Sequence, residues 1–318
     1  MTTTSDIESG ILLVNKPVGM TSFQVVSRIR KLCGVRKAGH CGTLDPFASG
    51  LLPVAVGRAT RVVRYMDSYD KTYRCRVRFG AFTDTQDRDG VQTGGRLPTD
   101  SELRALEESD YEQIRRMILN LSGDRMQIPP MYSAVKSNGK PLYAYARQGI
   151  TLERSERPIR IHHVEVHAIG VDEALYADFS VSCSKGTYIR TLCDDLGRES
   201  GFGAYADALI RTRCGPYPLS DSHTLEELEE KKSRGELADL FLPEDSALSH
   251  LPSLFLSEEE EAAIRMGKLL DLSLFASRMT DCTTGVRTVV RGNCGPIAVV
   301  YPDIREGREI LRIERVFS

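Results

Sequence analysis

The sequence predicts an α+β fold followed by a small β-rich domain, and three observations support this prediction. Lys71–Gly80 and Leu175–Cys183 alternate apolar and polar residues with the two-residue period of a half-buried strand. The segment 22–33 instead places apolar residues near the 3.6-residue spacing of an amphipathic helix. Residues 253–318 hold one helical pattern and several short strand-like runs, a spacing typical of a small barrel.

The composition is that of a soluble globular protein. The chain has 318 residues, of which 41% are hydrophobic and 27% charged, which suggests two domains. It lacks an apolar run of the roughly 20 residues that cross a bilayer. Residues 1–9 are polar and do not resemble a secretory signal, so we expect a disordered lead-in. The 8 cysteines are scattered without a C-x-x-C motif, which argues against a zinc site or a disulfide framework and favours reduced thiols in the cytoplasm.

The charge is strongly polarised although the net charge is only −2. Residues 11–80 hold 13 Lys and Arg against 3 Asp and Glu, whereas residues 221–265 hold 4 against 13. A basic N-terminal part fits the binding of phosphate groups on one face. The same arginines would also suit an ordinary solvated surface, and composition does not decide between these interpretations.

The first third of the chain predicts a strand, a helix and two further elements. Gly10–Asn15 is an apolar strand. The next helix begins at a capping box, Thr21 with Gln24, and ends at Gly34. Its spacing predicts four buried side chains: Phe23, Val26, Ile29 and Leu32. After a further strand, Leu51–Val56, a helix over 57–66 aligns three basic side chains: Arg58, Arg61 and Arg64.

The strand over 71–80 presents two chemically different faces. One face is apolar and includes Tyr73, and the other carries three arginines. Two polar helices follow between residues 99 and 121. Residues 126–149 mix basic side chains with three tyrosines and several helix breakers, so we expect an extended segment suited to RNA contact.

The C-terminal half is predicted to continue with strands and helices. A strand over 159–169 precedes Leu175–Cys183, and the turn at 184–190 leads into a helix that runs to about residue 199. A charged helix covers 224–236. We place the domain boundary near 243–252, where proline and polar residues cluster. The tail then has a helix over 257–267, capped by Ser257 and Glu260. Its predicted strands cover 286–291, 296–301 and 310–316.

The stretch 39–53 is the most informative part of the chain. It is rich in Gly and Pro, so we expect a loop held in a special path rather than a helix interior or a central strand. A single carboxylate, Asp45, lies in it between apolar neighbours, where an acid is costly unless it is paired or used. A lone Asp-Pro pair would more simply be a turn.

The full run resembles the catalytic loop of the TruB family of tRNA pseudouridine synthases, which reads G-H-x-G-x-L-D-P-x-A-x-G-x-L-P. Every fixed position is matched over 39–53. Further matches are K-P-x-G-x-T-S at 16–22, K-x-Y at 71–73, T-D-T-x-D-x-x-G at 83–90 and C-S-K-G-T-Y-I-R-T-L at 183–192. Cys41 departs from the pattern, because the family often has Thr there. The resemblance covers about residues 10–220 strongly and the tail weakly.

This resemblance implies a fold, an activity and a partner. The implied fold is that of the pseudouridine synthases, with a mixed, mainly antiparallel sheet flanked by helices over residues 10–245 and a PUA-like RNA-binding domain over 250–318. The implied reaction converts uridine to pseudouridine in the T-loop of tRNA, conventionally at position 55, after base flipping. The implied enzyme is a monomer that binds the tRNA stem-loop through a clamping segment at about 124–155. It needs no metal, cofactor, guide RNA or obligatory protein partner.

The resemblance also assigns residue roles. Asp45 is the nucleophile, either bonded covalently to the sugar or stabilising it after an elimination. Arg190 pairs with Asp45, although a helical pair with Asp194 is the plain alternative. Tyr73 stacks on the flipped uracil and is a candidate to take a proton. The remaining assignments comprise three substrate-binding residues, His40, Tyr188 and Leu209, and two loop supports, Lys16 and Pro17.

Each of these residues also has an ordinary structural interpretation. Tyr73 and Leu209 suit a hydrophobic core, His40 suits a satisfied loop histidine, and Lys16 and Pro17 suit a simple loop-to-helix entry. For the whole chain, the main alternative is a non-catalytic protein that binds or folds RNA on the same scaffold. A glycosidase that hydrolyses nucleic acid is less consistent with the sequence, because such enzymes usually need two carboxylates and one is evident. A guide-RNA-dependent relative is disfavoured by the absence of lysine-rich tails.

Overall fold

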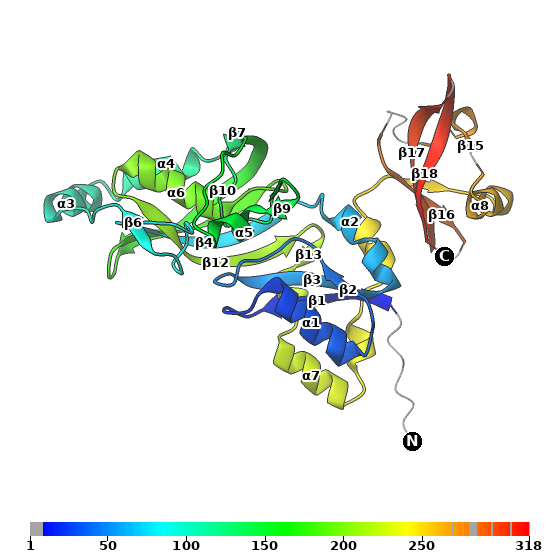
Figure 1. The fold of residues 1–318 in the computed structure, drawn as a ribbon, viewed down its shortest axis with the longest axis horizontal. Coiled ribbons are helices and arrows are strands. Elements are labelled where there is room, and N and C mark those ends of the chain that lie inside the picture. The colour runs from blue at the N-terminus through cyan, green and yellow to red at the C-terminus, as the bar shows by residue number, and fades with distance from the viewer. Residues whose placement is uncertain are drawn as a thin grey trace. The chain divides into compact units, whose positions relative to one another are not determined.

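The computed structural model divides after Phe241 into two compact units (Figure 1). It describes residues 9–268, 270–275, 277–279, 285–293, 295–305 and 307–317. Most of the predicted lead-in, residues 1–8, and two of the cysteines, Cys282 and Cys294, lie outside this set. The six cysteines that the structure describes are free. Within the same residues, none of the helices is long and apolar enough to cross a membrane.

The first unit is built on a nine-stranded sheet in the order β1-β3-β12-β4-β11-β10-β7, with β2 paired to β3 and β13 paired to β12. All its pairings are antiparallel except β12 with β3, so the predicted mixed, mainly antiparallel sheet is confirmed. Its strands are β1 (Ser9–Lys16), β2 (Ala38–His40), β3 (Ser49–Gly57), β4 (Lys71–Phe79), β7 (Gly123–Gln127), β10 (Arg157–Val171), β11 (Leu175–Cys183), β12 (Ala204–Cys214) and β13 (Tyr217–Pro218). A separate hairpin pairs β5 (Phe82–Thr83) with β6 (Gln92–Gly94).

The two strands with the clearest sequence alternation form the centre of the larger core. In β4 and β11 every second side chain is buried, as their patterns predict. Helices α4 and α6 pack on the buried face of these strands (Figure 1). The helices of this region are α3 (Asp100–Glu108), α4 (Glu112–Leu119) and α6 (Ile189–Ser200). Thr99 caps α3, and Glu102 completes the capping box.

A second core joins β1 and β3 to helices α1 (Ser22–Cys33) and α7 (Leu225–Ser233), which lie side by side in Figure 1. The predicted capping box at Thr21 and the end at Gly34 are confirmed. The predicted burial of Phe23 is wrong, because its side chain is 75% exposed. Val25 takes the buried position instead. The spacing alone allows either set of residues, and packing against β2 and β3 selects the one that includes Val25.

Part of the predicted loop is strand. Residues 41–48 form the loop, whereas Gly39–His40 belong to β2 and 49–53 belong to β3. Pro53 lies within the paired strand β3, and its carbonyl oxygen accepts a 3.1 Å hydrogen bond from the Cys41 N–H.

Two further predictions need correction. The helix predicted over 57–66 is two short turns, η1 (Arg58–Arg61) and α2 (Val63–Met66). The segment predicted to be extended over 126–149 contains a hairpin of β8 (Lys136–Ser137) and β9 (Lys140–Pro141), then helix α5 (Leu142–Ala146). Asn138 and Gly139 form its turn with φ values of 50° and 79°. Asn-Gly is a strong signal for such a two-residue turn and was available in the sequence.

Two short 3₁₀ turns, η2 (Leu219–Asp221) and η3 (Leu237–Leu240), lie near the end of the first unit, and a third, η4 (Glu244–Leu248), lies at the start of the second unit. That unit holds a five-stranded sheet in the order β14-β16-β17-β18-β15. Its elements are β14 (Ser253–Phe255), α8 (Glu258–Arg265), β15 (Leu270–Asp271), η5 (Leu272–Leu274), β16 (Thr288–Gly292), β17 (Gly295–Arg305) and β18 (Arg308–Val316). The predicted cap at Ser257 is present. Among the described residues the strands form an open sheet rather than a closed barrel.

Gly50 is required where β3 pairs with β12 in parallel, and its replacement tests how closely the two strands approach each other. Its φ is +99°, and an added Cβ would lie 2.5 Å from the Arg211 carbonyl oxygen. We expect Gly50→Ala to lower the free energy of unfolding by about 3 kcal/mol, because two backbones would have to separate. Urea unfolding followed by circular dichroism measures the loss. The control is Gly34→Ala, which has a similar backbone conformation but open space around the Cβ, and should cost about 1 kcal/mol. Equal losses in the two variants would contradict the steric argument.

Candidate active site

One pocket of about 240 Å³ collects most of the predicted site residues. The Asp45 loop, the first residues of β4, the start of α6 and the middle of β12 surround it. Five of the predicted residues line it: Asp45, Tyr73, Tyr188, Arg190 and Leu209. His40, Lys16 and Pro17 do not line this pocket.

Arg190 pairs with Asp45 across the pocket, as the resemblance implies. Its Nε lies 2.8 Å from Asp45 Oδ2. The arginine side chain is 4% exposed and the carboxylate 35% exposed, so the cation is buried and the acid reaches the pocket. The alternative pair with Asp194 is wrong, because Asp194 instead accepts from Arg198 at 2.8 Å. The ion pair therefore holds the Asp45 carboxylate in one orientation at the edge of the pocket.

Arg190 is fixed by contacts with three further residues in two other chain segments. Its Nη1 donates to the Thr85 carbonyl oxygen at 2.6 Å, and its Nη2 donates to the Tyr132 carbonyl oxygen at 2.7 Å. Nη1 also lies 3.4 Å from Asp87 Oδ2. The guanidinium fork therefore has a single orientation, which aims Nε at Asp45.

Asp87 is a site residue that the sequence analysis missed. It is buried, accepts from Thr85 Oγ1 at 2.6 Å, and accepts from the Asp89 N–H at 3.1 Å. Burial raises the pKa of this carboxyl, and the hydrogen bond from Thr85 and the charge of Arg190 oppose the rise. The signal was the T-D-T-x-D-x-x-G run at 83–90, which matches the family pattern. The contacts of Asp87 show that this run orders the site around Arg190.

Two tyrosines give the pocket aromatic surfaces. Tyr73 is buried on the apolar face of β4, and burial raises the pKa of its phenol to about 12, against the opposing effect of Arg211. Tyr188 stands just before α6, where its N–H donates to Gln127 Oε1 at 2.8 Å and its carbonyl accepts from Gln127 Nε2 at 3.0 Å. Burial also raises the pKa of Tyr188. Both rings are therefore phenols, not phenolates, at neutral pH.

Arg211 is a second residue that the sequence analysis missed. Its side chain is 1% exposed, yet it also lines the pocket. Its Nε donates to the Leu51 carbonyl oxygen at 2.7 Å, and its Nη2 donates to that of Gly42 at 3.1 Å. It therefore ties both ends of the Asp45 loop to β12. Leu209 and Arg211 are two residues apart on a strand, so their shared face was predictable once β12 was recognised.

The start of α1 supports the Asp45 loop from the other side. Lys16 is fully buried, and its Nζ donates to the carbonyl oxygens of Met20 at 2.6 Å and Pro17 at 2.9 Å, and lies 3.5 Å from that of Pro46. Burial lowers the pKa of this lysine to about 8, and Asp45 opposes the fall. Ser22 exchanges two hydrogen bonds with the backbone of Leu44, of 3.0 and 2.8 Å. These contacts favour the predicted supporting role of Lys16 and Pro17.

The chain matches known proteins along most of its length. The model described as TruB family pseudouridylate synthase (N terminal domain) matches residues 30–189, and the model described as tRNA pseudouridylate synthase B C-terminal domain matches residues 190–249. Proteins named tRNA pseudouridine synthase B from Bacillus velezensis and Geobacillus thermodenitrificans are 42% and 40% identical to it. Each alignment covers 92% of this chain, and 94% and 91% of the relatives respectively.

Solved structures show the same fold. A chain from the crystal structure of a Cbf5-Nop10-Gar1 complex aligns with a TM-score of 0.73 at 25% identity, covering 98% of this chain and 86% of that one. A chain from an H/ACA RNP bound to a substrate RNA containing 2'-deoxyuridine aligns with a TM-score of 0.71 at 23% identity, covering 100% and 88%. Because the second match is only 23% identical, it supports the fold and nothing further.

Replacing Asp87 tests whether it holds Arg190 in place. We expect Asp87→Asn to lower the free energy of unfolding by about 3 kcal/mol, because a buried cation loses one of its two carboxylates. Turnover should fall about tenfold or more as Arg190 loses its fixed orientation. The matched control is Asp178→Asn, which breaks a pair with Arg76 on the half-exposed face of the sheet and should cost less. Unchanged stability and turnover in Asp87→Asn would contradict the assignment.

Proposed function

The chain belongs to the TruB family and makes pseudouridine in tRNA; on that premise we propose that its target is the T-loop uridine, conventionally position 55, with Asp45 as the nucleophile. The observation that carries this proposal is the pairing of Asp45 with Arg190 at the edge of a pocket. Arg190 and Asp87 are buried, while the carboxylate of Asp45 remains open to a ligand.

The reaction needs a nucleophile that stays anionic beside the sugar. In one route, an Asp45 oxygen bonds to C1′ as the N1–C1′ bond breaks and the uracil leaves with the electron pair. In the other, the sugar loses its C2′ proton as the uracil leaves with the electron pair of the N1–C1′ bond, and Asp45 stabilises the sugar that remains. Both routes need an oriented carboxylate, which Arg190 provides.

The pocket suits a uracil that has left its stack. The glycosidic bond of a base inside a folded loop is out of reach, so the nucleotide must be flipped out. Tyr73 and Leu209 would contact the base, and Tyr188 would complete the enclosure. The uracil then turns, and its C5 bonds to C1′ while the Asp45 oxygen–C1′ bond breaks or, after an elimination, while C2′ regains its proton. The C5 proton then leaves, and N1 takes up a proton.

A surface outside the pocket suits the binding of tRNA without a guide RNA. The segment over 124–155 exposes apolar side chains, among them Met126 and Tyr143, and it also carries basic residues. Such a surface suits stacked bases and paired phosphates. We propose that this segment clamps the T stem-loop, that the second unit is the PUA-like RNA-binding domain, and that the enzyme acts as a cytoplasmic monomer without a guide RNA.

Replacing Asp45 tests the nucleophile. We expect Asp45→Asn to abolish pseudouridine formation while tRNA affinity stays within about threefold, because the amide keeps the shape but is not nucleophilic. The measurement uses an unmodified tRNA transcript, with the product mapped by mass spectrometry. Asp67→Asn, at an exposed position of the same unit, is the control. Wild-type protein that binds the transcript without modifying it would support the non-catalytic alternative, and an active Asp45→Asn variant would refute the assignment.

Replacing Tyr73 separates stacking from proton transfer. Tyr73→Phe keeps the ring, so tRNA affinity should change little. If the hydroxyl oxygen takes the C5 proton, turnover should fall at least about 100-fold. The wild-type rate of that step should then rise with pH, because a phenol with a pKa of about 12 is more ionised at higher pH. If the Tyr73→Phe variant turns over at the wild-type rate, the hydroxyl has no part in proton transfer, and the role of Tyr73 is limited to stacking.

A further inference from the structure

Two buried cysteines, Cys41 and Cys214, lie in contact next to the residues that line the pocket. Cys41 is the first residue of the Asp45 loop, and Cys214 is the last residue of β12. Their Sγ atoms are 3.8 Å apart, and both residues are fully buried. Neither is part of a disulfide. Because the family often has Thr at the position of Cys41, this pair is a feature of the chain rather than of the family pattern.

The two sulfurs belong to parts of the fold that are held differently. Cys214 is paired with Lys71 of β4 inside the nine-stranded sheet, so its backbone is fixed on that side. Cys41 begins a loop and has fewer contacts. Its N–H donates to the Pro53 carbonyl oxygen at 3.1 Å, and its thiol donates to that of Met66 at 3.0 Å. A bond between the two sulfurs would therefore move the loop rather than the sheet.

Two cations favour a thiolate at Cys214. The hydrogen bond with Cys41 lowers the pKa of Cys214, and the charges of Arg211 and Lys71 lower it further. Burial and the charge of Asp67 oppose this fall. Cys41 keeps its proton, because its hydrogen bond with Cys214 and its burial raise its pKa. The site therefore favours a thiolate beside a thiol, which is the combination from which a disulfide forms.

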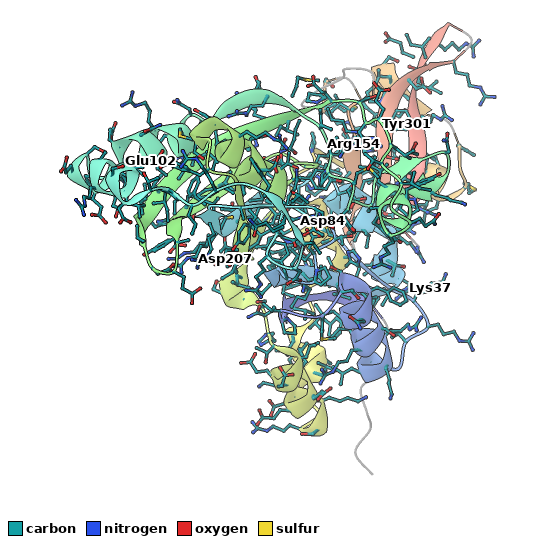
Figure 2. The ribbon with its side chains drawn as sticks, turned by 60° about the vertical axis from the view of Figure 1, so that its left-hand side comes forward. Lys37, Asp84, Glu102, Arg154, Asp207 and Tyr301 are labelled. Atoms are coloured by element: carbon teal, nitrogen blue, oxygen red, sulfur yellow. The ribbon has the colours of Figure 1, made fainter. Side chains whose placement is uncertain are left out.

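A second buried pair, Cys75 with Cys193, has the opposite electrostatic surroundings. Their Sγ atoms are 3.6 Å apart, so the two pairs are alike in distance and in burial. The hydrogen bond with Cys193 and burial raise the pKa of Cys75, and the carboxylates of Asp178 and Asp207 raise it further. Asp207, on the neighbouring strand β12, is labelled in Figure 2. Charge rather than distance therefore distinguishes the pair at the Asp45 loop.

We propose that Cys41 and Cys214 form a modification site, at which a peroxide converts the two thiols into a disulfide that displaces the Asp45 loop and slows turnover. The bond itself does not depend on the proposed function. Its effect on turnover rests on that function, because it acts through the position of Asp45. Access is through the pocket: Gly42 follows Cys41 directly and lines it, so a small oxidant in the pocket reaches the sulfurs after a local opening of the loop.

The reaction balances with the peroxide as the oxidant. The Cys214 thiolate attacks one peroxide oxygen, the O–O bond breaks, and the departing oxygen takes up a proton and leaves as water or an alcohol. Cys214 is then a sulfenic acid. The Cys41 sulfur attacks the Cys214 sulfur, the S–O bond breaks, and the hydroxyl leaves as water with the Cys41 proton. The two sulfurs together give up two electrons, and the peroxide takes up two.

The disulfide would disturb the site by a definite route. Sulfurs that are 3.8 Å apart must approach to about 2.05 Å, which draws the start of the loop toward β12. Oxidation also removes the proton that Cys41 donates to Met66. The 3.1 Å hydrogen bond from Arg211 Nη2 to the Gly42 carbonyl oxygen lies directly beside the moving residue. Because Asp45 follows in the same loop, and a misplacement of about 1 Å can lower a rate about 100-fold, turnover should fall.

Peptide mapping tests the bond itself. The purified protein is reduced, freed of reductant and treated with hydrogen peroxide, then alkylated and digested with trypsin in the absence of reductant. Mass spectrometry should find peptide 38–58, which contains Cys41, joined to peptide 214–231, which contains Cys214. The pair of Cys75 and Cys193 is the internal control, and we expect it to remain reduced under the same treatment.

Turnover of an unmodified tRNA transcript tests the consequence. We expect peroxide to lower the wild-type kcat at least about tenfold and dithiothreitol to restore it. Each variant is compared with its own reduced sample, so a change in basal activity does not enter the comparison. Cys41→Thr, which introduces the residue that the family often has, and Cys214→Ala should both lose the response to peroxide. Cys75→Ala, the matched control, should respond as the wild type does.

Four results would overturn the inference: the two peptides stay unjoined, Cys75 and Cys193 are joined as readily, the joined enzyme keeps the kcat of the reduced enzyme, or Cys41→Thr loses turnover to peroxide as the wild type does. The proposed function fails separately. If the reduced wild-type enzyme leaves the T-loop uridine unmodified, that function fails, whereas joined peptides would still support the modification site. If it modifies that uridine and the peptides stay unjoined, only the inference fails.

Discussion

The buried guanidinium of Arg190 is the interaction on which the rest of the site depends. Its donors reach Asp45, Asp87 and the carbonyl oxygens of Thr85 and Tyr132, which belong to three separate loops. Removing a cation from water is costly, and these four acceptors offset the cost because together they engage Nε, Nη1 and Nη2 of the guanidinium. The same geometry leaves Asp45 partly open to the pocket. The arrangement that makes burial of the arginine tolerable therefore also aims the carboxylate.

Such a pair contributes less to stability than to orientation. Buried ion pairs are often no more stabilising than apolar residues of the same volume, although breaking one is expensive. The loop around Asp45 accordingly depends on other contacts for its path. Arg211 and Lys16 hold it from opposite sides through backbone carbonyls, and Ser22 holds Leu44. Because these contacts go to backbone atoms, they fix the loop without neutralising Asp45.

The pocket has a positive electrostatic environment. Arg211 and Lys71 are buried at the pocket and form no ion pair with a described carboxylate. Lys71 instead donates to the Tyr69 carbonyl oxygen at 2.7 Å. Burying such a cation without a carboxylate partner costs free energy in the free protein, and a bound anion offsets that cost. The RNA backbone and a departing uracil both supply negative charge, so the electrostatics of the site suit the substrate better than they suit the empty enzyme.

The sequence by itself determined what depends on neighbouring residues. The alternation in β4 and β11, the caps at Thr21, Thr99 and Ser257, and the unusual loop at Asp45 follow from local spacing and backbone chemistry. Local spacing could not choose between Phe23 and Val25 as the buried residue of α1. It also gave no sign that Asp87 would meet Arg190.

Only the tertiary structure decided those points. Side chains about 100 residues apart in the sequence meet in the folded chain. They are brought together by the parallel pairing of β3 with β12, by the register of β4 with β11, and by the turn that carries Asp87. The energy of such a contact depends on desolvation and angle, which are set by packing rather than by the order of residues.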